Sequence, residues 1–142
     1  MKWQRMMNMK NKGIILGFIV MVILIAIFMK KPIETKKEIR YNTTHKRKDI
    51  EKIMDMAIDE YTNAQADVYS VYYDEDISHE TEQSYLQKGT DIQEVIVVYL
   101  EFKTRFFNVH PALGENHYYS DYMYIACKNA DGVWQWKDGG YG

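Results

Sequence analysis

Residues Gly13 to Met29 form an uninterrupted apolar run of seventeen residues, GIILGFIVMVILIAIFM, without charge or proline. A helix rises about 1.5 Å per residue, so the run spans about 26 Å, slightly less than the bilayer hydrocarbon core of about 30 Å. Lys12, Lys30 and Lys31 flank it and can extend their ammonium groups to the lipid headgroups. Twelve of the seventeen residues are Ile, Leu, Val or Phe, whose insertion free energies sum to about −5 kcal/mol. The sequence therefore predicts one transmembrane helix over residues 13–29.

A cleaved signal peptide also has a basic start followed by an apolar run. This run is longer than the usual apolar region of about 7–15 residues, and Lys30, Lys31 and Pro32 follow it in place of a small-residue cleavage site. We therefore expect an uncleaved signal-anchor in the cell membrane. The basic start favours a cytoplasmic tail over residues 1–12 and an extracellular C-terminal domain, although basic residues are nearly balanced on the two sides of the run.

Charge is distributed unevenly along the chain. Residues 1–40 contain nine Lys or Arg and two Glu, a net charge of +7, whereas residues 41–142 contain nine Lys or Arg and eighteen Asp or Glu, a net charge of −9. The basic part adjoins the predicted membrane helix, where it can attract anionic lipid. The acidic part argues against a nucleic-acid partner, since phosphate binding needs a basic surface. The single cysteine excludes an intrachain disulfide.

Apolar periodicity after the linker predicts one helix and a set of strands. Within 49–66, apolar residues recur from Ile50 to Ala64 at helical spacing and form one stripe, and Thr43 or Thr44 is expected to cap this helix. A short helix over 81–88 is expected to end at Gly89. Alternating, β-branched and aromatic residues predict strands over 68–73, 93–107, 118–128 and 133–137, with a hairpin turn over 129–132.

Consecutive strands with short connections favour an antiparallel sheet. We expect an α+β fold in which the amphipathic helix packs on an antiparallel sheet of about four strands, a cystatin-like arrangement or a reduced nuclear-transport-factor-2-like cone. The expected organisation is a basic tail over 1–12, a transmembrane helix over 13–29, a linker over 30–44 and an α+β domain over 45–142.

The C-terminal part resembles a group of small secreted or membrane-anchored proteins of Gram-positive bacteria with a domain of this cystatin-like or nuclear-transport-factor-2-like type. The resemblance covers about residues 49–142 and rests on Tyr73-Asp74-Glu75 with Ser78, Val95-Ile96-Val97-Val98 with Phe102, Asn116 with Tyr119, Asp121, Ile125 and Lys128, and Gly132-x-Trp134 with Asp138, Gly140 and Tyr141. It implies the limits of the domain and carries over no catalytic residue.

Eleven of the twelve tyrosines lie beyond the linker. Tyr and Trp provide stiff, amphipathic contact area for ligands and proteins. We expect ligand-binding residues among Tyr122, Tyr124, Trp134 and Trp136, with Tyr118 and Tyr119 beside them; the alternative is that these rings fill the core and its rim.

The other candidate motifs lack residues that their chemistry needs. His79-Glu80 begins like a zinc-helix motif, but Gln83 stands where the second histidine is needed. The four histidines do not have the spacing of metal ligands, and we expect them to be solvated surface residues. The acidic cluster around residues 74–82 lacks the spacing and glycine of a calcium loop. Cys127 falls within a strand and is expected to be a buried apolar residue. The sequence thus predicts no metal, no cofactor and no catalytic residue.

These observations favour a membrane-anchored extracellular domain that binds a protein or a small ligand without catalysis. One alternative is an assembly subunit of an envelope or conjugation machine, whose inner-membrane subunits share the order of short tail, membrane helix and cone-like domain. Another is a pocket enzyme of the isomerase type, suggested by Asp121 beside the tyrosines. The partners expected are the bilayer, through residues 13–29, and a protein or a second copy, since Gly13 and Gly17 allow close helix packing.

Overall fold

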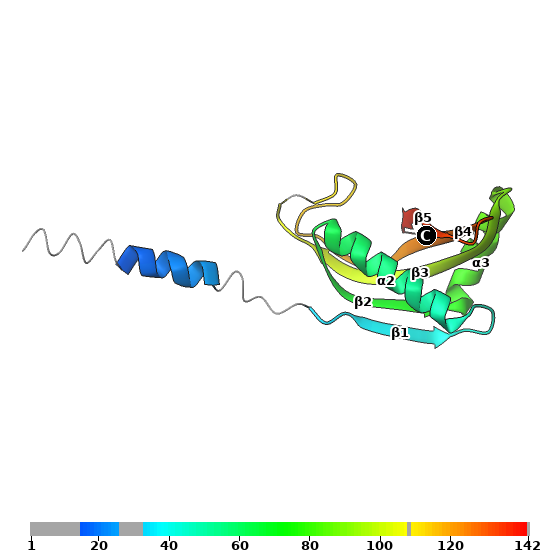
Figure 1. Ribbon diagram of the computed structural model, residues 1–142, viewed down its shortest axis with the longest axis horizontal. Coiled ribbons are helices and arrows are strands. Elements are labelled where there is room, and N and C mark those ends of the chain that lie inside the picture. Colours follow the sequence, from blue (N-terminus) through cyan, green and yellow to red (C-terminus); the bar gives the residue numbers. More distant parts are fainter. Residues whose placement is uncertain (1–14, 26–32, 108, 142) are drawn as a thin grey trace, which may run out of the picture. The chain divides into compact units, whose positions relative to one another are not determined.

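The computed structural model describes residues 15–25, 33–107 and 109–141. Residues Met1–Pro32 and Ile33–Gly142 form two separate units. The second unit is an α+β domain, as the sequence predicts (Figure 1). Its elements in chain order are β1 (Lys36–Tyr41), α2 (Arg47–Asn63), β2 (Ala66–Asp74), α3 (Glu75–Lys88), β3 (Ile92–Thr104), β4 (Tyr118–Asn129) and β5 (Trp134–Gly140).

The five strands form one mixed sheet in the order β1-β2-β3-β4-β5. β1 pairs with β2 in parallel, and each of the other neighbouring pairs is antiparallel. The sequence predicts about four strands, all antiparallel. The structure differs in two respects, since it has a fifth strand, β1, and the β1–β2 pair is parallel. The parallel pair follows from α2, which connects β1 to β2 as a crossover helix.

The additional strand, β1, lies within residues 30–44, which the sequence analysis treated as a linker. Its sequence, KKEIRY, has only one aliphatic residue, Ile39, and both ends of the strand are exposed. Charged residues are typical of edge strands, where lysine discourages pairing with other chains. The compact unit consequently starts at Ile33 and not at residue 45.

One face of the sheet is covered by α2. The stripe predicted for this helix is confirmed, because Ile50, Ile53, Met54, Ala57 and Tyr61 are all buried. They pack against alternate residues of the strands, among them Ile96, Val98, Leu100 and Phe102 of β3. No side chain caps the start of α2, and the prediction of a threonine cap is wrong.

The opposite face is partly covered by α3, which packs on Val95, Val97 and Tyr99 of β3 and on Ile125 and Cys127 of β4. α3 begins at Glu75, six residues before the predicted start at Thr81. Asp74 provides the cap, since its carboxylate accepts a hydrogen bond from the Asp76 amide at 3.2 Å. Glu75 and Asp76, which follow the predicted 68–73 strand, form the first turn of this helix, where carboxylates are favourable.

The β4–β5 hairpin turn lies where the sequence predicts it. Gly132 has φ of +77°, the left-handed conformation that favours glycine. β5 then continues to Gly140, beyond the predicted strand end at residue 137, so the glycine-rich segment is the end of the edge strand.

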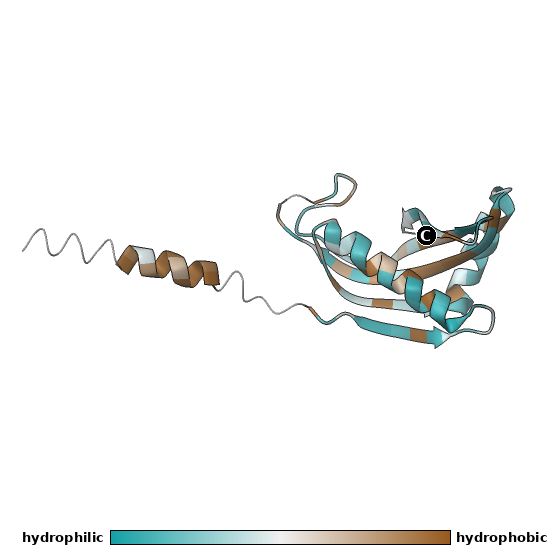
Figure 2. Ribbon diagram, viewed as in Figure 1, coloured by the Kyte–Doolittle hydropathy of each residue, from teal (hydrophilic) through white to brown (hydrophobic). Residues whose placement is uncertain are grey.

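The described part of the N-terminal unit is a helix over residues 15–25 (Figure 2), and its side chains are predominantly hydrophobic. Both ends of the predicted 13–29 membrane helix, the 1–12 tail and the first residues of the predicted linker lie outside the described residues. Within the residues that are described, no helix is long and apolar enough to cross a membrane.

Candidate functional site

A pocket of about 170 Å³ opens beside the C-terminal part of α2. Three parts of the chain that are distant in sequence form it: the end of α2, the β3–β4 loop, and the facing residues of β4 and β5. It is lined by Glu60, Tyr61, Ala64, His110, Ala112, Leu113, Tyr122, Trp136, Asp138 and Gly139.

Stacked aromatic rings support the inner wall of the pocket. The ring centroid of Tyr61 lies 4.6 Å from that of Phe102 and 5.6 Å from that of Tyr122. Tyr122 also contacts Tyr119 and Tyr141 edge-on, at 5.4 Å and 5.3 Å. Pairs at these separations stabilise each other beyond the area they bury, so the ring contacts hold this wall together.

Gly139 allows β5 to approach Tyr61 closely. A Cβ atom at this position would lie 2.9 Å from the Tyr61 hydroxyl oxygen and 3.2 Å from the Met123 carbonyl oxygen. Any larger residue would have to push the strand or the ring away. Glycine is therefore required for the shape of the pocket.

The outer rim is formed by Trp136, whose side chain is 53% exposed, and by Leu113 of the β3–β4 loop. Leu113 is held in place by hydrogen bonds on both sides. Its amide donates to the His110 carbonyl at 2.8 Å, and the Gly114 amide donates to the Tyr119 hydroxyl at 2.8 Å. The rim thus offers apolar surface to a ligand without further ordering.

The electrostatic character of the pocket is mildly acidic. Glu60 and Asp138 are its formally charged lining residues, and none of the described residues that line it is Lys or Arg. Burial raises the pKa of Tyr61, and Tyr122 adds to this effect; burial also raises the pKa of Tyr122. Both phenols are consequently neutral hydrogen-bonding groups near pH 7, and the pocket suits an uncharged or cationic aromatic or aliphatic group.

The structure divides the four predicted ligand-binding residues into two pairs. Tyr122 and Trp136 line the pocket, whereas Tyr124 and Trp134 are buried in the core under α2. Trp134 and Trp136 are two residues apart on β5, but Trp134 belongs to the core and is 6% exposed, whereas Trp136 is 53% exposed.

Of the two tyrosines expected beside these four residues, Tyr119 packs edge-on against Tyr122, whereas Tyr118 lies elsewhere. Tyr118 stacks on Tyr69 at 6.3 Å. Asp121 accepts a hydrogen bond from the Tyr72 hydroxyl at 2.6 Å and lines a separate polar depression with Tyr72, so it is not brought to the pocket. The acid-and-tyrosine arrangement suggested by the isomerase alternative is therefore not formed by Asp121 and Tyr122.

Sequence reasoning missed several residues of the pocket. Tyr61 belongs to the apolar stripe of α2, which predicts a core residue, and Gly139 lies after the last predicted strand. Leu113 and His110 lie in a loop without periodicity. One sequence feature indicates a pocket residue: Tyr61 lies near the end of the predicted helix, where the helix stops covering the sheet.

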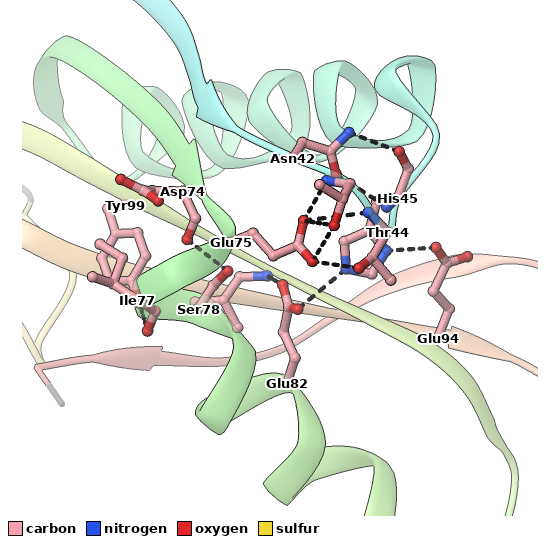
Figure 3. Close-up of polar contacts among 12 residues, drawn as sticks. Asn42, Thr44, His45, Asp74, Glu75, Ile77, Ser78, Glu82, Glu94 and Tyr99 are labelled. Carbon is pink, nitrogen blue, oxygen red and sulfur yellow. Dashed lines mark hydrogen bonds and ion pairs between the residues drawn. The ribbon is translucent and has the colours of Figure 1, made fainter.

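A second polar cluster, around His45, lies between the β1–α2 loop, α3 and β3 (Figure 3). The His45 side chain is 7% exposed, so the expectation that the histidines are all solvated is wrong for this one. Its Nε2 lies 3.1 Å from a Glu82 oxygen and its Nδ1 lies 2.8 Å from a Glu94 oxygen. The other Glu82 oxygen accepts the Val97 amide at 3.1 Å, and Lys128 lies 3.4 Å from Glu94.

This arrangement identifies the cluster as a structural ion network. Burial alone lowers the pKa of His45, but the hydrogen bonds and negative charges of Glu82 and Glu94 outweigh it and the pKa is raised. An imidazolium can donate from both nitrogens, which matches a carboxylate at each. The two carboxylates lie against different nitrogens and do not converge on one ion. In the described part of the chain, no group of three or more His, Cys, Asp or Glu is arranged to hold a metal.

Cys127 is buried on the α3 face of the sheet, which confirms its predicted position. Burial raises the pKa of its thiol, so the thiolate is disfavoured. The residue behaves as a small apolar side chain.

Comparison of the chain with known protein families, curated proteins and solved structures gives no match.

Proposed function

We propose that the chain is a single-pass membrane protein whose C-terminal α+β domain binds one aromatic or branched aliphatic side chain of a partner protein, without catalysis. The observation that carries this proposal is the pocket of about 170 Å³ between α2, the β3–β4 loop and β5. An apolar cavity of about 150 Å³ accepts benzene, whereas drug-sized ligands need about 300–1,000 Å³. The pocket therefore has room for one ring and not for a cofactor.

The composition of the pocket supports the same choice. Protein interfaces concentrate their binding energy in a few aromatic or Arg anchors that fill preformed pockets. Tyr61 and Tyr122 form a wall held together by ring contacts, and Trp136 at the rim is an exposed aromatic residue of the type enriched at interfaces. A partner protein also agrees with the alternative of an assembly subunit in a cell envelope.

The membrane part of the proposal rests on sequence. Residues 13–29 anchor the chain as an uncleaved signal-anchor, with residues 1–12 in the cytoplasm and the domain outside the cell. A Val133→Cys, Cys127→Ala variant tests this orientation, since Val133 is exposed in the β4–β5 turn. An impermeant thiol reagent should label it in intact cells. Labelling only after lysis would reverse the orientation.

Thermal unfolding of the full chain in mild detergent, with benzylammonium and benzyl alcohol as probes, tests the pocket. At ten times the dissociation constant, a probe specific for the folded state stabilises it by about 1.4 kcal/mol, which raises the midpoint by several degrees. Leu113→Trp should fill the pocket and abolish the shift. Val133→Trp, which adds the same ring in the β4–β5 turn, should retain it. Equal shifts in both variants, or no shift in the unmodified chain, would contradict the proposed site.

A further inference from the structure

Two adjacent phenylalanines directly follow β3 and are turned to solvent. Phe106 is 60% exposed and Phe107 is 80% exposed. Exposing two neighbouring large apolar side chains is unfavourable in water, and such a patch commonly marks an interaction site.

The residue directly before the pair, Arg105, is held by hydrogen bonds. The Arg105 amide donates to the Gln65 carbonyl at 2.9 Å, and the Asn116 amide donates to the Arg105 carbonyl at 3.0 Å. The Arg105 guanidinium is also paired with Asp67 at 2.7 Å. The two rings are therefore presented outward from an anchored position.

The pair lies at the end of the domain where the chain enters from its N-terminal part. β1 begins at Lys36, which is paired with Ser70, whereas Thr104 at the end of β3 is paired with Ala66. On β2, Ala66 precedes Ser70 by four residues, which is about 13 Å along the strand. Because β1 runs parallel to β2, the end of β3 lies about 13 Å beyond the point where β1 begins. Figure 1 shows the β3–β4 loop at this same end of the sheet. The phenylalanines thus lie beyond the first residue of β1.

Chain length limits how far this end can be from a membrane. Ile33, where the domain starts, is four residues after Met29, the last residue of the apolar run. Four residues span at most about 14 Å when fully extended. If residues 13–29 lie in a bilayer, the headgroup layer is within reach of this end of the domain.

We propose that Phe106 and Phe107 insert into the interfacial layer of the bilayer that anchors the chain, as a second membrane contact. This inference depends on the membrane anchor proposed above. The net charge of the domain does not favour anionic lipid, because residues 33–142 contain twelve Lys or Arg and twenty Asp or Glu, a net charge of −8. Burial of the two apolar rings in the interfacial layer can hold the domain at the membrane. Leu113 and His110 of the same loop line the pocket, so this contact sets the pocket beside the lipid surface, where a partner in the same membrane meets it.

The test uses the full chain in phosphatidylcholine vesicles that contain a lipid with a nitroxide near the top of its acyl chain. An environment-sensitive fluorophore is attached to a single cysteine at Phe107→Cys, in a Cys127→Ala background. The matched control is Val133→Cys, an exposed apolar residue in the β4–β5 turn, where β4 has run to the far end of the sheet from Thr104. We expect several-fold stronger quenching at position 107 than at position 133, and weaker quenching at 107 when Phe106→Ser is added.

Three results would overturn the inference, and they differ in what else they affect. If the chain floats with the vesicles but position 107 is quenched no more than position 133, the loop contact is wrong and the anchor stands. If the chain does not float with the vesicles, the anchor and the loop contact are both wrong. If the fluorophore at 107 is shielded only as protein concentration rises, without lipid quenching, the occupant of this surface is a second copy of the chain.

Discussion

Replacing His45 by glutamine should destabilise the domain in a manner that depends on pH. The substitution leaves Glu82 without its cationic partner, and the Glu82 side chain is only 4% exposed. Removing one partner of a buried ion pair costs about 3–5 kcal/mol, a large part of a total stability of about 5–15 kcal/mol. Glu94 adds less to this loss, because it is more exposed and keeps Lys128 at 3.4 Å.

The sign of the pH dependence follows from the raised pKa of His45 in the folded state. A group whose pKa is higher when folded binds its proton more tightly in the native protein. The stabilisation is thus complete below the unfolded pKa of about 6.5 and is lost as the pH rises through the folded value. The difference in free energy of unfolding between the unmodified chain and His45→Gln should be largest at acidic pH and should shrink as the pH rises.

Urea unfolding of the full chain in mild detergent, repeated from mildly acidic to alkaline pH, measures this difference. His79→Gln is the matched control, since His79 is exposed on α3 and its replacement should change stability little at any pH. A His45→Gln difference that stays constant with pH, or grows as the pH rises, would refute the charged network.

Two further perturbations test other parts of the structure. Gly139→Ala should destabilise the domain by about 1–3 kcal/mol, because the new Cβ meets the Tyr61 hydroxyl oxygen at 2.9 Å. Gly140→Ala is the control and should not destabilise the domain, because its new Cβ enters open space. Equal melting temperatures for the two variants would contradict the close approach of Gly139 to Tyr61. Hydrogen bonds from Thr44 and Thr43 lower the pKa of Glu75 to about 2 in the folded domain. The Glu75 carboxylate therefore stabilises the domain fully above its unfolded pKa of about 4.5, and this stabilisation is lost as the pH falls towards 2. Glu75→Gln should therefore lower the melting temperature at pH 6 and lower it progressively less as the pH falls towards 2, and a deficit that does not shrink would be inconsistent with this account.

Regular apolar patterns were sufficient to predict the parts of the fold that bury most surface. The stripe of α2 and the two-sided alternation of β3 specify which residues face which layer, and the structure confirms both. β1 lacks such a pattern, because a charged edge strand has little apolar surface to bury. Its pairing with β2 is fixed by main-chain hydrogen bonds, which leave no signal in the sequence.

The two polar and aromatic sites show the same limit. The sequence predicts Tyr122 and Trp136 as ligand-binding residues because Tyr and Trp provide stiff, amphipathic contact area and several of them lie on the two strands that contain these residues. Tyr124 and Trp134 belong to the same pattern, and the sequence does not show which of these rings the packing of the domain buries. His45 could not be paired from sequence, because its partners Glu82 and Glu94 are 37 and 49 residues away.

The most direct test of the proposed function is the NMR signal of the indole N–H groups during titration with benzylammonium. Trp136 lines the pocket, whereas Trp134 is buried in the core two residues away and provides an internal control. The account predicts a saturable shift of the Trp136 signal with the Trp134 signal unchanged. No saturable shift, or equal shifts of both signals, would contradict the pocket as a binding site.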